Sequence, residues 1–547
     1  MTKKLPKIIN IFIMIFLFSL FIIYPLYFRH DYYDMVYAKY DLFKIIYRVF
    51  IPGMSILSIL YLIKNRKNIK LSVLSSKITK TDMFMLAYLI TCLLSYAFSF
   101  HKDTSFFGTS GWYMGLVTQI VMILFYFFLS IWFSDNKHIW WIITASSSIV
   151  FILGILQRFN IDILSMQEGF SNYGKLENHL KNLYISTLGQ STWHSSYLCI
   201  ILSIAMACFF LKNKYNTTTL KQKTWSLLWG LFLSICFCAL VIQNSDSGFV
   251  ALLGMFLVLF FVSFNSNEYF KRFLEIIIIC LASWKFIGIL QVIFKDNAFD
   301  IGGISTFCTQ NIIPFILLIF MIILYSMFSL AIKNNKFDIK KFTIFRNIIF
   351  ILIPISIIVL IIVMYLVTTG KIDNTFLNEI SYLNFNNSWG SDRGFIWKFS
   401  MNMFNDYSIG KKLFGCGPDA FAFEAYNYNP ILLQSYLVEP EYIGEKLTVL
   451  ACAHNEWLNH LINFGIVGAI SYIGIFLSAF VIFIKNYKKH PLILGGAIAI
   501  IAYMMHNFFC YQQILSTPII FVIIGIGIAI IRNIKRKEEN RSIDENV

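Results

Sequence analysis

Charged residues, cysteine and nucleotide-binding glycine motifs are scarce or missing in the sequence, and each shortage excludes a class of protein. Charged side chains make up 14% of the chain, against about 25% in soluble domains. Ten cysteines among 547 residues are too few for a disulfide scaffold. The sequence has no Gly-x-x-x-x-Gly-Lys-Ser/Thr segment for ATP, and no Cys/His cluster with the spacing of a structural zinc site.

Long hydrophobic runs take the place of these features. Hydrophobic residues make up 58% of the chain and gather in separated runs of about twenty, the length that crosses a bilayer. A water-soluble chain of this length would need a polar exterior on each of its domains. The composition therefore predicts an all-α polytopic membrane protein, and it excludes collagen-like and disordered chains.

Hydropathy along the chain predicts about fourteen transmembrane helices. The expected spans are 8–28, 42–63, 83–99, 114–133, 139–157, 195–212, 225–243, 248–264, 273–294, 312–332, 347–368, 465–484, 491–509 and 513–531. Charges inside these spans are few, and Lys285 is the clearest. The first run resembles a signal peptide but lacks a small-residue cleavage site, so we expect a retained helix.

The net charge of +16 is explained by topology. With the N-terminus inside, most Lys and Arg residues fall on cytoplasmic loops, as the positive-inside rule requires. We therefore expect both termini in the cytoplasm and the long loops outside. The basic surplus suits the anionic inner leaflet and does not indicate nucleic acid.

Four parts are expected along the chain. They are N-terminal transmembrane helices (1–184), a core (185–484) that includes a large outer loop (369–464), C-terminal transmembrane helices (485–532) and a cytoplasmic tail (533–547). The large loop is the only stretch long enough for a small folded subdomain outside the bilayer. Cys416 and Cys452 lie in it on the oxidising side, where a disulfide between them and two free thiols are both open.

Polar and titratable residues concentrate in the large loop. A helical pattern opens at 387–393, with Ser391 or Asp392 as its cap. Arg393 and Trp397 are four residues apart and share a face, and Lys398 lies beside it.

A second motif in the loop combines two glycines with a proline. Gly415 and Gly417 permit an unusual turn, and Pro418 suits the first position of a helix. Backbone N–H groups at such a helix start can hold an anion, although Asp419 would oppose it.

The segment from His454 to Gly465 is amphipathic at helical spacing. We expect His454 on the packed or membrane side and Glu456, His460 and Asn463 on the other. At a helix N-terminus the partial positive charge disfavours an imidazolium, so His454 should be neutral near pH 7 and able to accept a proton. The alternative is a packed histidine bound to a carbonyl.

Four segments together resemble a known family: Ser186–Leu198, Arg393–Lys398, Leu413–Phe421 and His454–Gly468. Their order and spacing over roughly 185–475 are similar to those of the O-antigen ligase and polymerase family. Two departures stand out. The stretch from Asn244 to Gly248 has no arginine where the family often has one, and Asn463 stands where many members carry Glu.

The resemblance implies a GT-C-like glycosyltransferase. Such a protein passes a glycan from a polyprenyl-diphosphate carrier to an acceptor hydroxyl, on a glycan, lipid or protein, at the outer face of the cytoplasmic membrane. It implies no metal and no other cofactor. By motif, His454 matches the general base and Arg393 a residue that contacts the diphosphate. Further expected substrate-binding residues are Lys398, Trp397, Asn455, Gly415, Gly417 and Asp246, the last of which would repel a diphosphate.

Three other interpretations stay open. His30 is followed by Asp31, Asp34 and Asp41, which could bind a metal or act as a base in the first outer loop. A lipid-linked glycan flippase or another transporter is compatible with fourteen spans, although transporters usually place charges within the membrane. A sensor or scaffold is the third.

Overall fold

The computed structural model describes residues 4–32, 34–65, 78–211, 220–334, 337–372, 377, 380–437 and 450–544. Twelve helices in this part of the chain are long and apolar enough to cross a membrane, and α7 (Leu116–Trp132) and α23 (Pro491–His506) are shorter apolar helices. Each of the fourteen expected spans coincides with one of them. The prediction of an all-α polytopic membrane protein is therefore confirmed.

The remaining elements in chain order are as follows. The helices are α1 (Lys4–Phe18), α2 (Tyr24–Leu26), α3 (Met35–Lys64), α5 (Lys80–Phe98), α6 (Lys102–Phe107), α8 (Ile139–Arg158), α9 (Glu177–Leu183), α10 (Ser191–Phe210), α11 (Leu220–Ile242), α12 (Asp246–Ser263), α13 (Asn267–Ile293), α14 (Gly303–Gln310), α15 (Ile312–Lys333), α16 (Thr343–Thr368), α18 (Trp389–Asn405), α19 (Ile409–Phe414), α20 (Phe421–Tyr428), α21 (Pro430–Leu437), α22 (Glu456–Asn486) and α24 (Thr517–Asp544). Strands β1 (Tyr184–Ile185) and β2 (Gly189–Gln190) pair antiparallel, with Tyr184 opposite Gln190. A π-helical turn, Ser19–Ile23, joins α1 to α2.

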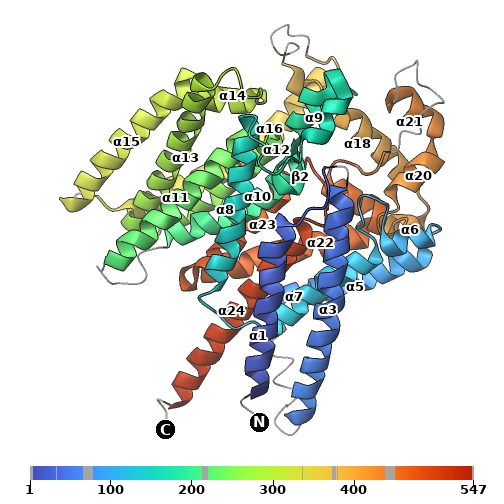
Figure 1. Cartoon of the computed structure of the whole chain (residues 1–547), viewed down its shortest axis with the longest axis horizontal. Helices are drawn as coiled ribbons and strands as arrows, with labels where there is room; N and C mark the ends of the chain where they lie inside the picture. Colours follow the sequence, from blue (N-terminus) through green and yellow to red (C-terminus); the bar gives the residue numbers. More distant parts are fainter. Residues whose placement is uncertain are drawn as a thin grey trace.

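The centre of the bundle is formed by α10 and α23. Almost every side chain of α10 is buried, and this helix packs against α11 and α23 (Figure 1). Helix α23 also contacts α12 and α22, while α22 lies along α5. A bilayer offers no hydrogen bonds to the backbone, so the segments that cross it are helices, whose peptide groups bond one another.

At the periphery, α15 and α16 expose most of their side chains. Val367 is the one buried residue among those of α16, whose surface is bulky Ile, Leu and Val. Such a surface is as apolar as lipid tails, and it carries few of the small residues that draw transmembrane helices together.

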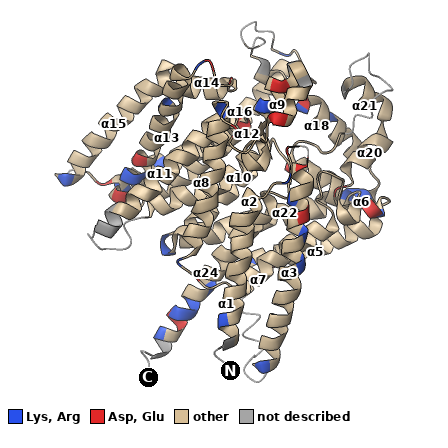
Figure 2. Cartoon of the chain, viewed as in Figure 1, with Lys and Arg blue, Asp and Glu red and all other residues tan. Residues whose placement is uncertain are grey.

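Both chain termini lie at one end of the molecule, and α18, α20 and α21 of the large loop lie away from it (Figure 1). Lys and Arg mark the last turns of α24 and the neighbouring ends of α1 and α3 (Figure 2). This arrangement agrees with two termini on one side of the membrane. Helix α24 continues through the expected tail as far as Asp544.

Charges inside the bundle are more numerous than expected. Besides Lys285, which donates to the carbonyls of Thr309 (3.0 Å) and Asn311 (2.5 Å), the fold buries Lys39. Its Nζ donates to the carbonyls of Tyr24 (2.7 Å) and Pro25 (2.9 Å). Each of these lysines donates hydrogen bonds to two backbone carbonyls, so both have a structural role.

Candidate functional site

Arg393 follows a left-handed turn at the start of α18. Gly390, Ser391 and Asp392 have φ values of 62°, 57° and 66°, a conformation that costs energy for residues with a Cβ. The expected cap at Ser391 or Asp392 is therefore wrong, because both residues belong to this turn. The carboxylate of Asp392 instead accepts a hydrogen bond from the Tyr436 hydroxyl (3.2 Å).

The Arg393 guanidinium ties this turn to the loop between α23 and α24. Nη1 donates to the Gly390 carbonyl (2.5 Å) and Nη2 to the Phe509 carbonyl (3.0 Å). Nε is buried and has no partner among the described residues. Burial lowers the pKa of Arg393. With five N–H donors on the group, hydrogen-bonding capacity remains for a further acceptor.

His454 lies just before α22 in a left-handed conformation (φ 47°). Its neighbours are held from several sides. The Ala453 carbonyl accepts a bond from Trp397 Nε1 (3.1 Å), and the Ala453 N–H donates to Asn459 Oδ1 (3.2 Å). Asn455 caps the helix by accepting a bond from the Leu458 N–H (3.0 Å). Trp397 and Asn455 therefore fix the backbone on either side of His454.

His454 and Arg393 both contact the loop after α23: Arg393 Nη2 donates to the Phe509 carbonyl (3.0 Å), and the centre of the His454 ring lies 5.5 Å from that of Tyr511. Burial, and to a lesser extent the positive charge of Arg393, together lower the pKa of His454 to about 4. The ring is therefore neutral near pH 7, with burial as the main cause. Asp246, the exposed first residue of α12, also interacts electrostatically with Arg393.

Tyr511 is a site residue that sequence reasoning missed. Its ring lies 5.5 Å from the His454 ring in an edge-on arrangement. Its hydroxyl donates to Gln190 Oε1 (3.1 Å) and accepts a bond from Trp193 Nε1 (3.2 Å). Tyr511 thus joins the 186–198 motif to His454. No spacing in the sequence marks it, because its partners come from distant helices.

The polar face of α22 points into the bundle: Glu456, His460 and Asn463 are buried, whereas the opposite stripe is only partly buried. Glu456 is fully buried and accepts bonds from the hydroxyls of Tyr472 (2.5 Å) and Tyr503 (3.0 Å) and from the Asn507 amide. Its N–H donates to the Asn507 carbonyl (2.9 Å). In a bilayer, polar side chains avoid lipid and pack inward, so Glu456 anchors the start of α22 two residues after His454.

The turn with Gly415 and Gly417 packs backbone to backbone against the break in α22 at Gly465. We call this contact between the three glycines the glycine interlock. The N–H groups of Cys416 and Gly417 donate to the carbonyls of Ile462 and Asn463, both at 3.1 Å. A Cβ on Gly415 would lie 2.2 Å from the Asn463 backbone, and one on Gly465 would lie 2.4 Å from the Leu413 backbone. These glycines permit close backbone contact.

The expected anion site at this turn is wrong. α20 begins at Phe421 and not at Pro418, and the carboxylate held here is the protein's own. Asp419 accepts bonds from the N–H groups of Thr109 (2.7 Å) and Met114 (3.1 Å). Burial raises the pKa of Asp419 to about 7, against the two amide donors, which lower it.

Lys398 is exposed at the rim of the site. Its Nζ donates to Asn387 Oδ1 at 3.4 Å and lies 5.2 Å from the centre of the Phe385 ring.

A guanidinium lies beside the arginine-free stretch 244–248, but it comes from α8. Arg158 is buried, and its Nε donates to the Ile242 carbonyl (2.7 Å). Its Nη1 and Nη2 donate to Asn182 Oδ1 (2.8 Å) and the Asn182 carbonyl (2.7 Å). Arg158 therefore fastens helix ends.

Cys416 and Cys452 are two free thiols. All ten cysteines are free and buried, so the Cys416–Cys452 disulfide is not formed. Cys416 contacts Asn463, with 3.7 Å between Sγ and Oδ1. Cys452 instead packs with Cys510 and Tyr511.

The acidic residues of the first outer loop are engaged by cations. Arg29 pairs with Asp34 (2.5 Å) and Asp41 (3.1 Å), and Lys44 pairs with Asp41 (2.8 Å). The described residues contain no group of three His, Cys, Asp or Glu arranged for a metal ion. These contacts favour a structural role for Asp34 and Asp41.

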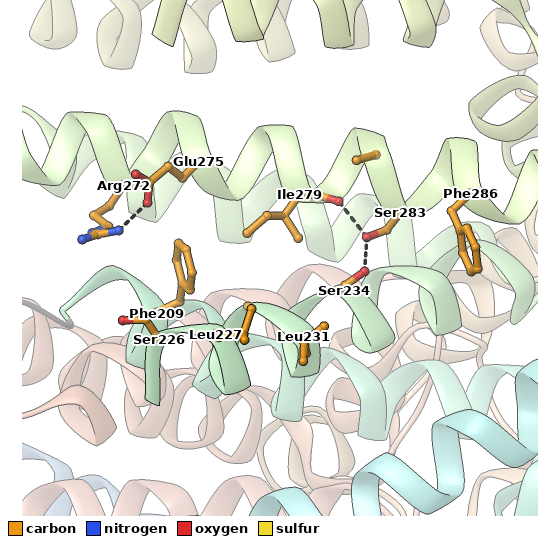
Figure 3. Close-up of a pocket in the computed structure, with 12 residues that line it drawn as sticks. Phe209, Ser226, Leu227, Leu231, Ser234, Arg272, Glu275, Ile279, Ser283 and Phe286 are labelled. Atoms are coloured by element: carbon orange, nitrogen blue, oxygen red, sulfur yellow. Dashed lines mark hydrogen bonds and ion pairs between the residues drawn. The ribbon is translucent and has the colours of Figure 1, made fainter. Parts of the chain in front are cut away.

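A groove between α11 and α13 shares no lining residue with this site (Figure 3). Arg272 pairs with Glu275 (2.5 Å) at one end, and the hydroxyls of Ser234 and Ser283 bond across it (2.7 Å). Most of its remaining lining is apolar.

Comparison with known proteins identifies one family. Residues 298–473 match the family described as O-Antigen ligase, a segment that contains Arg393, the glycine interlock and His454. The resemblance seen in the sequence is confirmed over these residues. No curated protein matches the chain.

Gly465→Ala should destabilise the protein by at least about 2 kcal/mol, because it forces a positive φ on a residue with a Cβ and a collision with Leu413. Gly410→Ala is the matched control, since nothing lies within 4 Å of its added Cβ. Thermal unfolding of both variants in the same detergent measures the difference. Equal midpoints would show that the interlock carries no stability.

Proposed function

Because residues 298–473 match the O-antigen ligase family, we propose that the protein is a membrane glycosyltransferase. It transfers a glycan from a polyprenyl-diphosphate carrier to an acceptor hydroxyl, on another glycan, a lipid or a protein, at the outer face of the cytoplasmic membrane. One observation carries the proposal: an imidazole and a guanidinium meet the same short loop, since Arg393 bonds the Phe509 carbonyl (3.0 Å) and the ring centres of His454 and Tyr511 are 5.5 Å apart.

His454 acts as the general base in this proposal. A ring nitrogen takes the proton of the acceptor hydroxyl while the hydroxyl oxygen attacks the anomeric carbon of the donor sugar. The bond between that carbon and the phosphate oxygen breaks, and its electron pair leaves with the diphosphate. Arg393 stabilises the departing charge, for which a guanidinium is suited by paired hydrogen bonds.

Donor binding would also tune the base. In the free protein the charge of Arg393 adds to burial in lowering the pKa of His454. A bound diphosphate brings negative charge beside both groups, which offsets Arg393 and raises that pKa. His454 therefore becomes a stronger base only when the donor is in place.

The other expected residues divide into two groups. Trp397, Asn455, Gly415 and Gly417 are positioning residues, because their contacts hold the backbone around His454 and α22. Lys398 and Asp246 are exposed and are kept as substrate-binding residues. The proton acceptor and the charge stabiliser are both side chains, so the proposal assigns no step to a metal or a nucleotide.

Replacement of the two proposed catalytic residues tests the reaction. His454→Ala should lower kcat by about 100-fold or more, and Arg393→Ala by about 100- to 1,000-fold. His179→Ala and Arg541→Ala, at exposed positions, are matched controls and should transfer normally. The measurement is transfer of lipid-linked glycan by purified protein in vesicles. Normal transfer by both site variants would end the proposal, and flipping without bond formation would favour a flippase.

The pH dependence tests the link between His454 and the donor. The base must be neutral, so activity falls as the pH drops through its pKa. For the donor, kcat/KM reports the free protein and should fall toward pH 4, whereas kcat reports the complex and should fall at higher pH. Initial rates across pH at low and saturating donor give both profiles. Coincident acid limbs would contradict the proposed role of the diphosphate.

A further inference from the structure

A shallow open pocket lies beside α18, near Arg393. Its lining comes from the end of α16, the segment 384–388, one side chain of α18 and one of α21. We propose that this pocket is a glycan subsite, which binds hydroxyl-rich sugar units next to the transfer site. The inference rests on the proposed function and names where the sugars of one substrate are held.

Side-chain amides give the pocket its chemistry. Asn384, Asn386 and Asn387 line it together with Lys398. Asn386 Oδ1 accepts a bond from Ser388 (3.0 Å) and Asn387 Oδ1 one from Lys398 (3.4 Å). Among the described residues, their amide nitrogens have no protein partner. An amide that donates and accepts at adjacent atoms matches neighbouring sugar hydroxyls, which also do both.

Aromatic rings supply the apolar walls. Phe385 and Tyr436 both line the pocket, and the apolar faces of sugar rings can lie against such surfaces. A few placed polar groups beside aromatic walls are typical of a small-molecule site. Phe385 also packs against Trp389 (5.2 Å between ring centres) and Trp397 (6.2 Å). Since Trp397 bonds the residue before His454, the pocket is joined to the transfer site by packed rings.

The segment 384–388 is held in place before any ligand binds. The Phe385 N–H donates to Thr368 Oγ1 (2.8 Å), which ties the segment to α16. The Phe395 N–H donates to the Asn387 carbonyl (2.9 Å). A Cβ on Gly394 would lie 1.9 Å from the Asn386 backbone carbonyl oxygen, so the segment packs directly against α18. A fixed site loses less entropy on binding.

The position of the pocket suits an extended substrate. Arg393 and Lys398 are five residues apart on α18, which is about 7.5 Å along the helix axis and about 140° around it. A glycan whose diphosphate lies at Arg393, or an acceptor glycan that approaches His454, therefore passes the amides within a few sugar units.

The test uses the full chain in nanodiscs and, as probe, the glycan released by mild acid from lipid-linked saccharides of the producing cells. Asn386→Ala/Asn387→Ala should weaken binding of this probe about tenfold or more, since two hydrogen-bonding groups are lost. Asn387→Asp, of nearly equal size, removes one amide donor and checks that folding is not the cause. Asn402→Ala/Asn405→Ala, at exposed positions of α18, is the matched control and should bind normally.

Kinetics distinguish which substrate occupies the pocket. In the double variant, KM should rise about tenfold for the donor or for the acceptor while kcat stays within about twofold. Arg393→Ala should lose transfer but keep probe binding. If the wild-type protein binds the probe and transfers nothing, the proposed function fails while the subsite stands. Unchanged binding and unchanged KM values in the double variant would overturn the subsite.

Discussion

Polar groups cannot face lipid, and this constraint arranges most of the protein. Lys39 is satisfied by two carbonyls, and Glu456 by two tyrosines and an amide. The buried Glu456 carboxylate has a structural role, because its hydrogen bonds hold the first turn of α22 against α23. His454 lies two residues before that turn begins. Because polar side chains are costly in lipid and are buried inside the bundle, burial of Glu456 also sets the position of His454.

Unfavourable backbone conformations surround the candidate site. Ser391, Asp392 and His454 all have positive φ, which costs free energy unless the surroundings impose it. Here they do: Arg393 bridges Gly390 and Phe509, and Trp397 bonds Ala453. The same hydrogen bonds therefore hold the strained turns and bring α18 to the start of α22.

The sequence allowed much of the fold to be predicted, because a transmembrane span is a local property of about twenty residues. The site was only partly accessible. Arg393 and His454 were found through motifs, but which face of α22 is buried stayed open, since an amphipathic pattern alone does not say whether water or lipid lies outside. Tyr511 and Arg158 could not be located, because their roles come from contacts with Gln190 and Ile242, more than eighty residues away in each case.

An amphipathic donor sets a geometric requirement for the proposed transfer: its lipid must stay in the bilayer while its sugars stay in water. The elements at the site meet this requirement in order. Helix α16 presents an almost wholly lipid-like surface and ends at Thr368, which lines the amide pocket. Arg393 lies beside that pocket on α18. A lipid chain along the apolar helices, a diphosphate at Arg393 and sugars at Asn386 and Asn387 would place each part of one molecule in the environment that solvates it best.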